Sequence, residues 1–216
     1  MSQNSISSPN ATERTSGTSP SQRIYAFDFD GTLTTSDSLM EIICWHRGRT
    51  WLIAALLLML PKLVLMFLHL YSNQKSKEEL LLRCFGHISR DDFSALCHRF
   101  AASHSHILRP STCDVLRQAH EAGHEVRVVT ASPAMWVSAF LPGVKVLGTE
   151  LEFDSNGFTG RFLTPNCYGQ EKVERLLKEF PALATQRGNI HLTAYGDSRG
   201  DREMLAFADD PHLIKE

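Results

Sequence analysis

Short apolar runs alternate with amphipathic segments along most of the chain, and this alternation predicts its secondary structure. Runs rich in β-branched and aromatic residues predict buried strands at 23–27, 125–130, 144–148 and 190–195. Apolar residues at helical spacing predict helices at 111–122, 133–140, 170–179 and 200–208. This alternation is typical of an α/β fold with a doubly wound, mainly parallel sheet.

A long helical region, residues 36–109, separates the first strand from the rest of the sheet. An Asn-Gly pair at 156–157 lies between alternating runs and predicts a β-hairpin. The hairpin takes up much of the later connection, so a second large insert has no room there. We therefore expect a catalytic core of residues 23–35 and 110–216 with a helical cap, 36–109, inserted in it.

Within this insert, residues 51–70 are apolar around the whole helical circumference, which indicates burial in protein or in lipid. Pro61 and Lys62 interrupt the middle of the segment. We expect two helices of about 10 residues, each about 15 Å long, that turn at Pro61 and enter one leaflet of a membrane. The alternative is an apolar hairpin packed inside the cap or against a second subunit.

Basic residues flank this apolar segment and suit an anionic membrane surface. Arg47 and Arg49 precede it, and Lys75 and Lys77 follow it. The expected membrane contact is therefore peripheral or re-entrant, on the cytoplasmic face of the membrane.

Composition narrows the function further. The formal net charge of −2 argues against a nucleic-acid partner. The five cysteines are scattered and suggest reduced thiols, which leaves a role for Cys167 near the site open. Residues 1–22 are polar, with no apolar stretch typical of a signal peptide, so we expect a disordered tail and a cytoplasmic protein.

The first strand ends in Asp28-Phe29-Asp30-Gly31-Thr32, which carries the strongest chemical signal in the chain. Both carboxylates lie at the carboxyl edge of the sheet, where open α/β sheets bind ligands. They suit a hard cation such as Mg²⁺, and one can attack phosphorus while the other moves a proton. The alternative is a turn in which the acids only cap backbone groups.

Three later segments support the chemical interpretation. Thr130 ends the second strand, and Ser132 is the expected N-cap of the next helix, so this turn offers an anion site. Asp197 and Asp201 follow the strand at 190–195. Lys172 lies in the first turn of the helix at 170–179. A positive charge is unfavourable at this end of the helix dipole, so its presence suggests that it binds an anion such as phosphate.

These four motifs, in this order, resemble the haloacid dehalogenase superfamily of phosphohydrolases, in particular the phosphoserine-phosphatase-like branch with a cap after the first strand. The apolar insert and the stretch Asn166-Cys167-Tyr168-Gly169-Gln170-Glu171-Lys172 are similar to the bacterial phosphatidylglycerophosphatase C group.

The resemblance implies a role for each matching residue. Asp28 attacks phosphorus and forms an aspartyl phosphate, and Asp30 protonates the leaving oxygen and then activates water. Mg²⁺ is held by the Asp28 carboxylate, the Asp30 main-chain carbonyl and Asp197. The remaining implied residues are Thr130, Ser132 and Lys172 at the substrate, and Asp201 and Thr34 as supporting groups.

The insert decides the substrate. Its apolar half favours a phosphorylated lipid, with phosphatidylglycerol phosphate as the specific expectation. A soluble phosphatase for a small polar metabolite such as phosphoserine is the alternative, with Glu41 and Arg83 as polar groups of the cap. A membrane-anchored binding module with a decayed site is a third possibility, which the complete set of polar residues argues against. The oligomeric state is left open.

Overall fold

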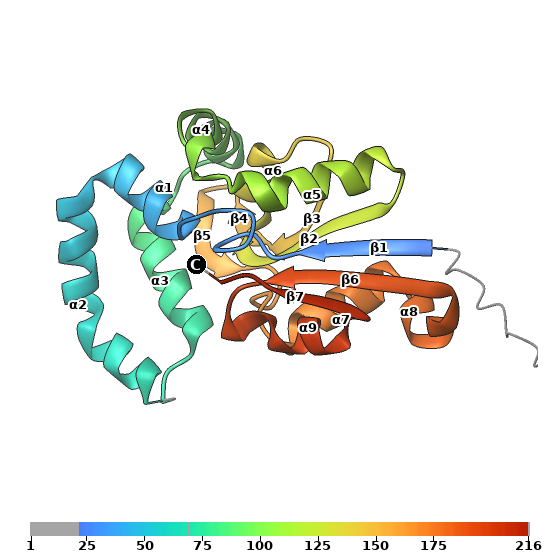
Figure 1. The fold of residues 1–216 in the computed structure, drawn as a ribbon. Coiled ribbons are helices and arrows are strands. Elements are labelled where there is room, and N and C mark those ends of the chain that lie inside the picture. Colours follow the sequence, from blue (N-terminus) through green and yellow to red (C-terminus); the bar gives the residue numbers. More distant parts are fainter. Residues whose placement is uncertain (1–21, 69, 216) are drawn as a thin grey trace, which may run out of the picture.

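A five-stranded sheet forms the centre of the molecule in the computed structural model, which describes residues 22–68 and 70–215 (Figure 1). All neighbouring strands of this sheet run parallel. Their spatial order is β3 (Lys145–Thr149), β2 (Glu125–Pro133), β1 (Gln22–Phe27), β6 (Ile190–Gly196) and β7 (Asp210–Leu213). The predicted α/β fold with a doubly wound parallel sheet is confirmed.

Helices cover both faces of this sheet. On one face lie α5 (Pro110–Glu121) and α6 (Ala134–Phe140), and on the other α7 (Gln170–Glu179) and α9 (Arg202–Phe207). A short helix, α8 (Ala182–Thr185), lies between α7 and β6. Side chains alternate along β1, so Phe27 joins one apolar cluster while Ile24 and Ala26 join the other. The central strand is thus buried on both faces.

The region between β1 and α5 is helical, as predicted. Its helices are α1 (Ser38–Arg47), α2 (Arg49–Phe67), α3 (Asn73–Phe85) and α4 (Arg90–Ser103), followed by a 3₁₀ turn at Ser105–Ile107. The expected hairpin forms from β4 (Leu151–Asp154) and β5 (Gly157–Phe162). The helix α4 packs on α6, and α3 packs on β5. The helices therefore share contacts with the later part of the chain.

The predicted break at Pro61 is wrong. The helix α2 continues through Pro61 to Phe67, and the chain turns back only between α2 and α3. An interior proline costs about 3 kcal/mol, but α2 packs along α1 and α3 on both sides of it, with Met59 buried and Leu63 partly buried. The apolar segment is therefore one helix of 19 residues, not two half-length helices.

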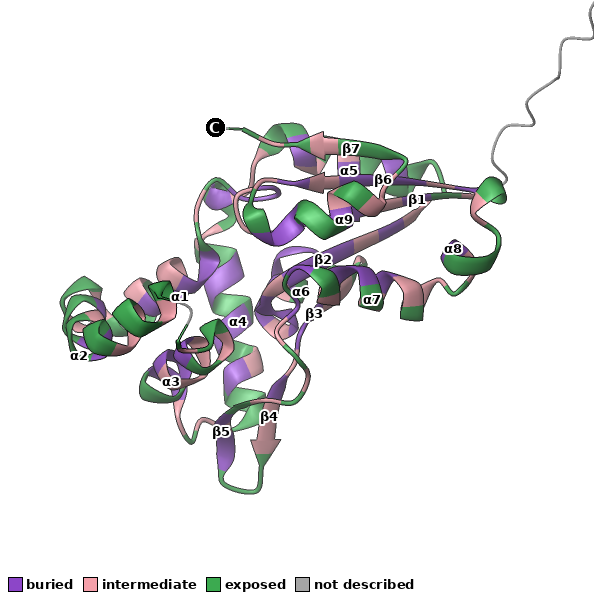
Figure 2. Cartoon of the chain, turned by 90° about the horizontal axis from the view of Figure 1, so that it is seen from below, coloured by how far each residue is buried: buried purple, intermediate pink, exposed green. Residues whose placement is uncertain are grey.

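Most of α2 faces outward, as its colouring in Figure 2 shows. Only Leu52, Ala55 and Met59 are buried along it. Among the described residues, α2 is the one helix long and apolar enough to cross a membrane by length and composition. The exposed large apolar side chains of this segment are Ile53, Leu57, Leu58, Leu60, Val64, Leu65, Phe67, Leu68 and Leu70.

Three smaller differences concern the ends of the sheet. The edge strand β7 was not predicted because Asp210-Pro211-His212-Leu213 has no apolar run, and an edge position tolerates its proline. The helix expected at 200–208 is a 3₁₀ turn, Arg199–Asp201, followed by α9. Gln22 begins β1, and the expected disorder of residues 1–21 lies outside the described residues.

Candidate active site

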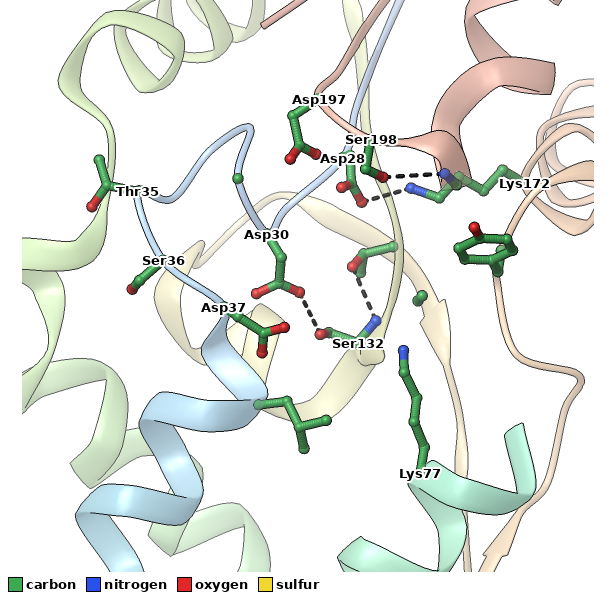
Figure 3. Close-up of a pocket in the computed structure, with 16 residues that line it drawn as sticks. Asp28, Asp30, Thr35, Ser36, Asp37, Lys77, Ser132, Lys172, Asp197 and Ser198 are labelled. Carbon is green, nitrogen blue, oxygen red and sulfur yellow. Dashed lines mark hydrogen bonds and ion pairs between the residues drawn. The ribbon is translucent and has the colours of Figure 1, made fainter. Parts of the chain in front are cut away.

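A pocket of about 380 Å³ opens at the carboxyl ends of β1, β2 and β6 (Figure 3). The loops after β1 and β6 and the end of β2 supply most of its wall, and α1, α3, α7 and the loop before α7 supply the rest. It is lined by Asp28, Asp30, Gly31, Thr35, Ser36, Asp37, Leu39, Lys77, Thr130, Ala131, Ser132, Tyr168, Lys172, Asp197, Ser198 and Gly200.

Lys172 is the buried cation of this pocket. Its Nζ donates to Asp28 Oδ1 at 2.6 Å and to Asp201 Oδ1 at 2.5 Å. All three side chains are almost fully buried. Burial alone would lower the pKa of Lys172, but Asp28 and Asp201 raise it, so the lysine stays protonated. It therefore holds the loop after β1 against the loop after β6.

Burial also raises the pKa of Asp28 to about 7, although Lys172 opposes this shift. Asp28 carries a second carboxylate oxygen, Oδ2, for which the described residues supply no hydrogen bond. Because the pocket is lined by Asp28, this oxygen belongs to the surface that a ligand meets. Asp28 is therefore placed to bind a cation or to attack an electrophile.

Asp201 is fully buried, and both its oxygens are engaged. Its Oδ2 accepts from the backbone N–H groups of Asp197 and Ser198 and from the Ser198 hydroxyl at 2.8–3.3 Å. Asp201 thus fixes the loop that carries Asp197, and it does not line the pocket. The structure places it as a support for its neighbours.

Asp197 lies against Gly31, whose φ of +74° and missing side chain permit this approach. A Cβ on Gly31 would come within 2.1 Å of Asp197 Oδ2. Burial raises the pKa of Asp197, and the nearby Asp201 adds to the effect. The glycine of the first motif therefore allows Asp197 to reach the loop that carries Asp28 and Asp30.

Asp30 is held from two sides. Its Oδ2 accepts from the Ser132 hydroxyl at 2.5 Å, and its Oδ1 accepts from the Ser38 N–H at the start of α1 at 2.7 Å. Burial raises the pKa of Asp30, and the hydrogen bonds from Ser132 and Ser38 oppose this shift. Asp30 is thus fixed in position beside Asp28 at the end of β1.

Ser132 is not the N-cap that the sequence predicted. The strand β2 continues to Pro133 and α6 begins at Ala134, so the Ser132 hydroxyl is free to bind Asp30. Thr130 lies on the same strand end, and its Oγ1 accepts from the Ser132 N–H at 3.1 Å. Both residues line the pocket.

Thr34 is buried below the pocket and does not line it. Its Oγ1 accepts from the Gly31 N–H at 3.1 Å and donates to the Ser36 carbonyl at 2.7 Å. These hydrogen bonds brace the turn that follows β1 and carries Asp30.

Lys77 is the pocket residue that the sequence interpretation placed wrongly, as part of a basic flank beside a membrane segment. It comes from α3 and points into the pocket (Figure 3). A signal for this position existed, because Lys77 shares a helical stripe with the buried residues Leu80, Leu81 and Cys84. A charged residue at an inward-facing position of a helix indicates that its side chain has a functional role.

Three other candidates lie elsewhere. Arg83 is exposed and pairs with Glu79, and Glu41 does not line the pocket. Cys167 is buried, its Sγ donates to the Leu147 carbonyl, and burial raises its pKa to about 11, so it stays a thiol. None of these residues reaches the pocket wall.

The acids of this site could hold a cation. Asp28, Asp197 and Asp201 each offer a carboxylate oxygen within 4.8 Å of the others. Because Asp201 is occupied by Lys172 and backbone donors, Asp28 and Asp197 are the available ligands. Oxygen donors with so few protein ligands suit a hard cation that keeps several waters.

A parallel α/β sheet carries this acidic pocket and its buried lysine at the carboxyl edge, where enzymes with such sheets bind their ligands. The model of the haloacid dehalogenase-like hydrolase family matches residues 25–206, and the chain belongs to that family. The resemblance inferred from the four motifs is confirmed, and the chain is an enzyme with the fold of this family's phosphatases.

A sequence relative and a solved structure are similar to most of the chain. Protein CicA of Caulobacter vibrioides is 34% identical over 198 residues, which cover 87% of this chain and 83% of CicA. A protein of unknown function from Bordetella pertussis Tohama I has a similar structure, with a TM-score of 0.71, 22% identity and coverage of 88% of this chain and 89% of its own.

Solved phosphatases share the fold more distantly. A phosphoserine phosphohydrolase-like protein from Francisella tularensis subsp. tularensis SCHU S4 has a TM-score of 0.57 at 15% identity, covering 86% of this chain and 82% of its own. A substrate-bound phosphoserine phosphatase has a TM-score of 0.51 at 14% identity. The match covers 87% of this chain and 83% of the phosphatase chain. At these identities the likeness concerns the fold.

Proposed function

We propose that this protein is a Mg²⁺-dependent phosphomonoester hydrolase that works through an aspartyl-phosphate intermediate. The observation that carries this proposal is the buried Asp28–Lys172–Asp201 group beside Asp197 and Asp30. It combines a nucleophile, a fixed cation and a proton donor in one pocket, as phosphoryl transfer requires.

In the first step, an Asp28 oxygen attacks phosphorus, the bond from phosphorus to the leaving oxygen breaks, and Asp30 gives that oxygen its proton. In the second step, Asp30 takes a proton from water as the water oxygen attacks phosphorus. The bond to Asp28 then breaks and orthophosphate leaves. Thr130, Ser132 and Lys172 bind the phosphoryl oxygens or orient the groups that do so.

Asp28, the Asp30 main-chain carbonyl and Asp197 would hold Mg²⁺, which when bound neutralises charge on the phosphoryl oxygens. Asp201 would orient the Asp197 loop, and Thr34 the turn after β1. The decisive assay is release of orthophosphate, with and without Mg²⁺, from phosphatidylglycerol phosphate, phosphatidate, phosphoserine and phenyl phosphate. Failure to hydrolyse any phosphomonoester would contradict the proposal.

Replacing Asp197 by asparagine should raise the Mg²⁺ concentration needed for half-maximal activity about tenfold or more, equal to about 1.4 kcal/mol of binding free energy. The amide keeps the shape beside Gly31 but loses the negative charge. Activity titrated against Mg²⁺ measures the effect, and Asp91→Asn, an exposed change on α4, is the control. An unchanged midpoint would remove Asp197 from the metal ligands.

A lipid phosphate, with phosphatidylglycerol phosphate as the specific candidate, is the substrate we favour. The outward apolar face of α2 supports it, because monomeric proteins rarely expose such large continuous apolar patches. The helix α2 packs along α1 and α3, and its Lys62 pairs with Glu79 of α3 at 2.5 Å. Because these contacts hold one side of α2 against the protein, α2 suits a position in the plane of the membrane interface. The runner-up is a soluble phosphatase for a phosphoserine-like metabolite.

We further propose that residues 36–109 form the cap of this enzyme, set on a core of 23–35 and 110–216, and that the protein works at the cytoplasmic face of the membrane. The contacts of α4 with α6 and of α3 with β5 support a cap docked on the core. Membrane contact would then bring the pocket beside the lipid head groups.

If α2 lies in the membrane, the protein should sediment with membranes, resist extraction by high salt and dissolve in detergent, because screening does not weaken apolar burial. Leu57→Asp with Leu65→Asp should move it to the soluble fraction, since a charge within the hydrocarbon costs about 2.5–3.5 kcal/mol per site. Cell fractionation measures both effects.

Leu57 and Leu65 are exposed, so their replacement leaves the packing of the cap unchanged. The paired change Ala95→Asp with Ala102→Asp, at exposed positions of α4, is the matched control. Wild-type protein found wholly in the soluble fraction as a single species without detergent would contradict membrane binding and favour the soluble substrate.

A further inference from the structure

The pocket contains two lysines, and they differ in how their charges are balanced. Lys172 is bound by two carboxylates. Lys77 enters from α3, and within residues 22–68 and 70–215 no hydrogen bond or ion pair is found for its ammonium group. Its neighbours on the same stripe of α3, Leu80 and Leu81, are buried, so Lys77 lies on the side of α3 that faces the interior.

An unpaired, partly buried ammonium is costly unless a ligand supplies the missing anion. Burial lowers the pKa of Lys77, and Asp30, Asp37 and Asp28 oppose that shift. These acids line the pocket together with Lys77, and none of the three forms an ion pair with it. Lys77 is therefore a preformed anion receptor that opens into the pocket.

The position of Lys77 identifies the part of the substrate that would meet it. Lys172 comes from α7 and lies at Asp28 and Asp201. Lys77 comes from α3, a different helix from α1 with its neighbouring Asp37, and its side chain points into the pocket (Figure 3). Asp30, which protonates the leaving oxygen in the proposed mechanism, is anchored to the start of α1 by the Ser38 N–H. A substrate with its phosphoryl group at Asp28 would therefore present its leaving group to the part of the pocket wall that α1 and α3 supply, where Lys77 lies.

We propose that Lys77 determines specificity by binding a second anionic group on the leaving portion of the substrate. This inference rests on the proposed phosphatase function and narrows its substrate class. Phosphatidylglycerol phosphate carries such a group as a phosphodiester, and phosphoserine carries it as a carboxylate. Phosphatidate and phenyl phosphate have neutral leaving groups and lack it.

Two matched pairs of substrates test the proposal and separate a lipid source from a soluble one. Phosphatidylglycerol phosphate is compared with phosphatidate in the same detergent micelles, and phosphoserine is compared with phenyl phosphate in buffer. The wild type should prefer the member with the second anion in at least one pair. The pair that shows the preference identifies the source.

Lys77→Met should lower kcat/KM for that anionic substrate about 10- to 100-fold, the size of a lost charged hydrogen bond. The loss should come mainly through KM. For the partner with a neutral leaving group, the change should stay within about threefold, because the phosphoryl contacts are intact. Lys77→Arg should retain most of the preference because it keeps the charge.

The control is Lys75→Met, an exposed lysine two residues earlier on α3, which should leave both substrates unchanged. Thermal melting of each variant checks folding, and if Lys77→Met is unfolded, Lys77→Gln and Lys77→Arg provide the comparison. Equal losses on both members of a pair, or a wild-type preference for neutral leaving groups, would overturn the proposal.

Failure of the underlying function has a different signature. An inactive wild type, or activity insensitive to Mg²⁺ and to Asp28→Asn, would reject the phosphatase mechanism and the role of Lys77 with it. Mg²⁺-dependent phosphatase activity with the same kcat/KM in Lys77→Met and the wild type would reject only the role of Lys77.

Discussion

Asp28→Asn should lower kcat for every phosphomonoester more than about 1,000-fold, since an amide cannot form the acyl phosphate and loss of a covalent nucleophile has effects of this size. The fold should survive. Burial raises the pKa of Asp28 to about 7, from 3.8 in an unfolded chain, so above pH 7 its charge opposes folding. A neutral asparagine avoids that penalty but removes one of the two carboxylates that bind the buried Lys172, so we expect a folded variant with a melting temperature somewhat below that of the wild type.

Orthophosphate release under saturating Mg²⁺ measures this loss, and a thermal melt monitors the fold. Asp91→Asn makes the same chemical change at an exposed position and should leave both readings unaltered. A well-folded Asp28→Asn enzyme that keeps more than about a tenth of wild-type turnover, far above that expectation, would show that another residue is the nucleophile.

Lys172→Met should both inactivate and destabilise the enzyme. Removing the lysine leaves Asp28 and Asp201 buried without their shared cation. Breaking a buried ion pair in this way costs about 3–5 kcal/mol, or a fall in melting temperature of roughly 6–20 °C for a chain of this size. Chemical denaturation in the absence of divalent cations gives the free energy of unfolding.

The control for Lys172→Met is Lys178→Met on the same helix, where the lysine is exposed and a change within about 0.5 kcal/mol is expected. If Lys172→Met melted within a degree or two of the wild type, the observed pairing would not contribute to stability. A variant that is stable but inactive would show that Lys172 acts in substrate binding and does not contribute to stability.

The sheet and the acidic residues were predictable because they depend on local sequence. Buried parallel strands appear as continuous apolar runs, and strands followed by Asp28, Thr130 and Asp197 must meet at one edge once the sheet forms. The sequence could not predict the pairing of Lys172 with both Asp28 and Asp201, because it depends on side-chain positions from three separate elements.

Errors arose where local rules compete with packing. Ser132 and Pro133 have the composition of a helix start, but β3 pairs with β2 as far as Pro133 and keeps the strand extended. Pro61 has the composition of a turn, but contacts of α2 with α1 and α3 hold it inside a helix. Lys77 was assigned to a flank because a linear sequence does not show which helix face meets the pocket.

The place of β1 in the middle of the sheet has a consequence for biosynthesis. Its residues Gln22–Phe27 pair with Ile190–Tyr195, near the other end of the chain. The strand β1 can pair with β2 earlier, but its other edge lacks a partner until almost the whole chain has been made, and contacts so distant in sequence form slowly. During that interval the outward leucines of α2 are already synthesised, so nascent chains should depend on a chaperone or an early membrane encounter to escape aggregation.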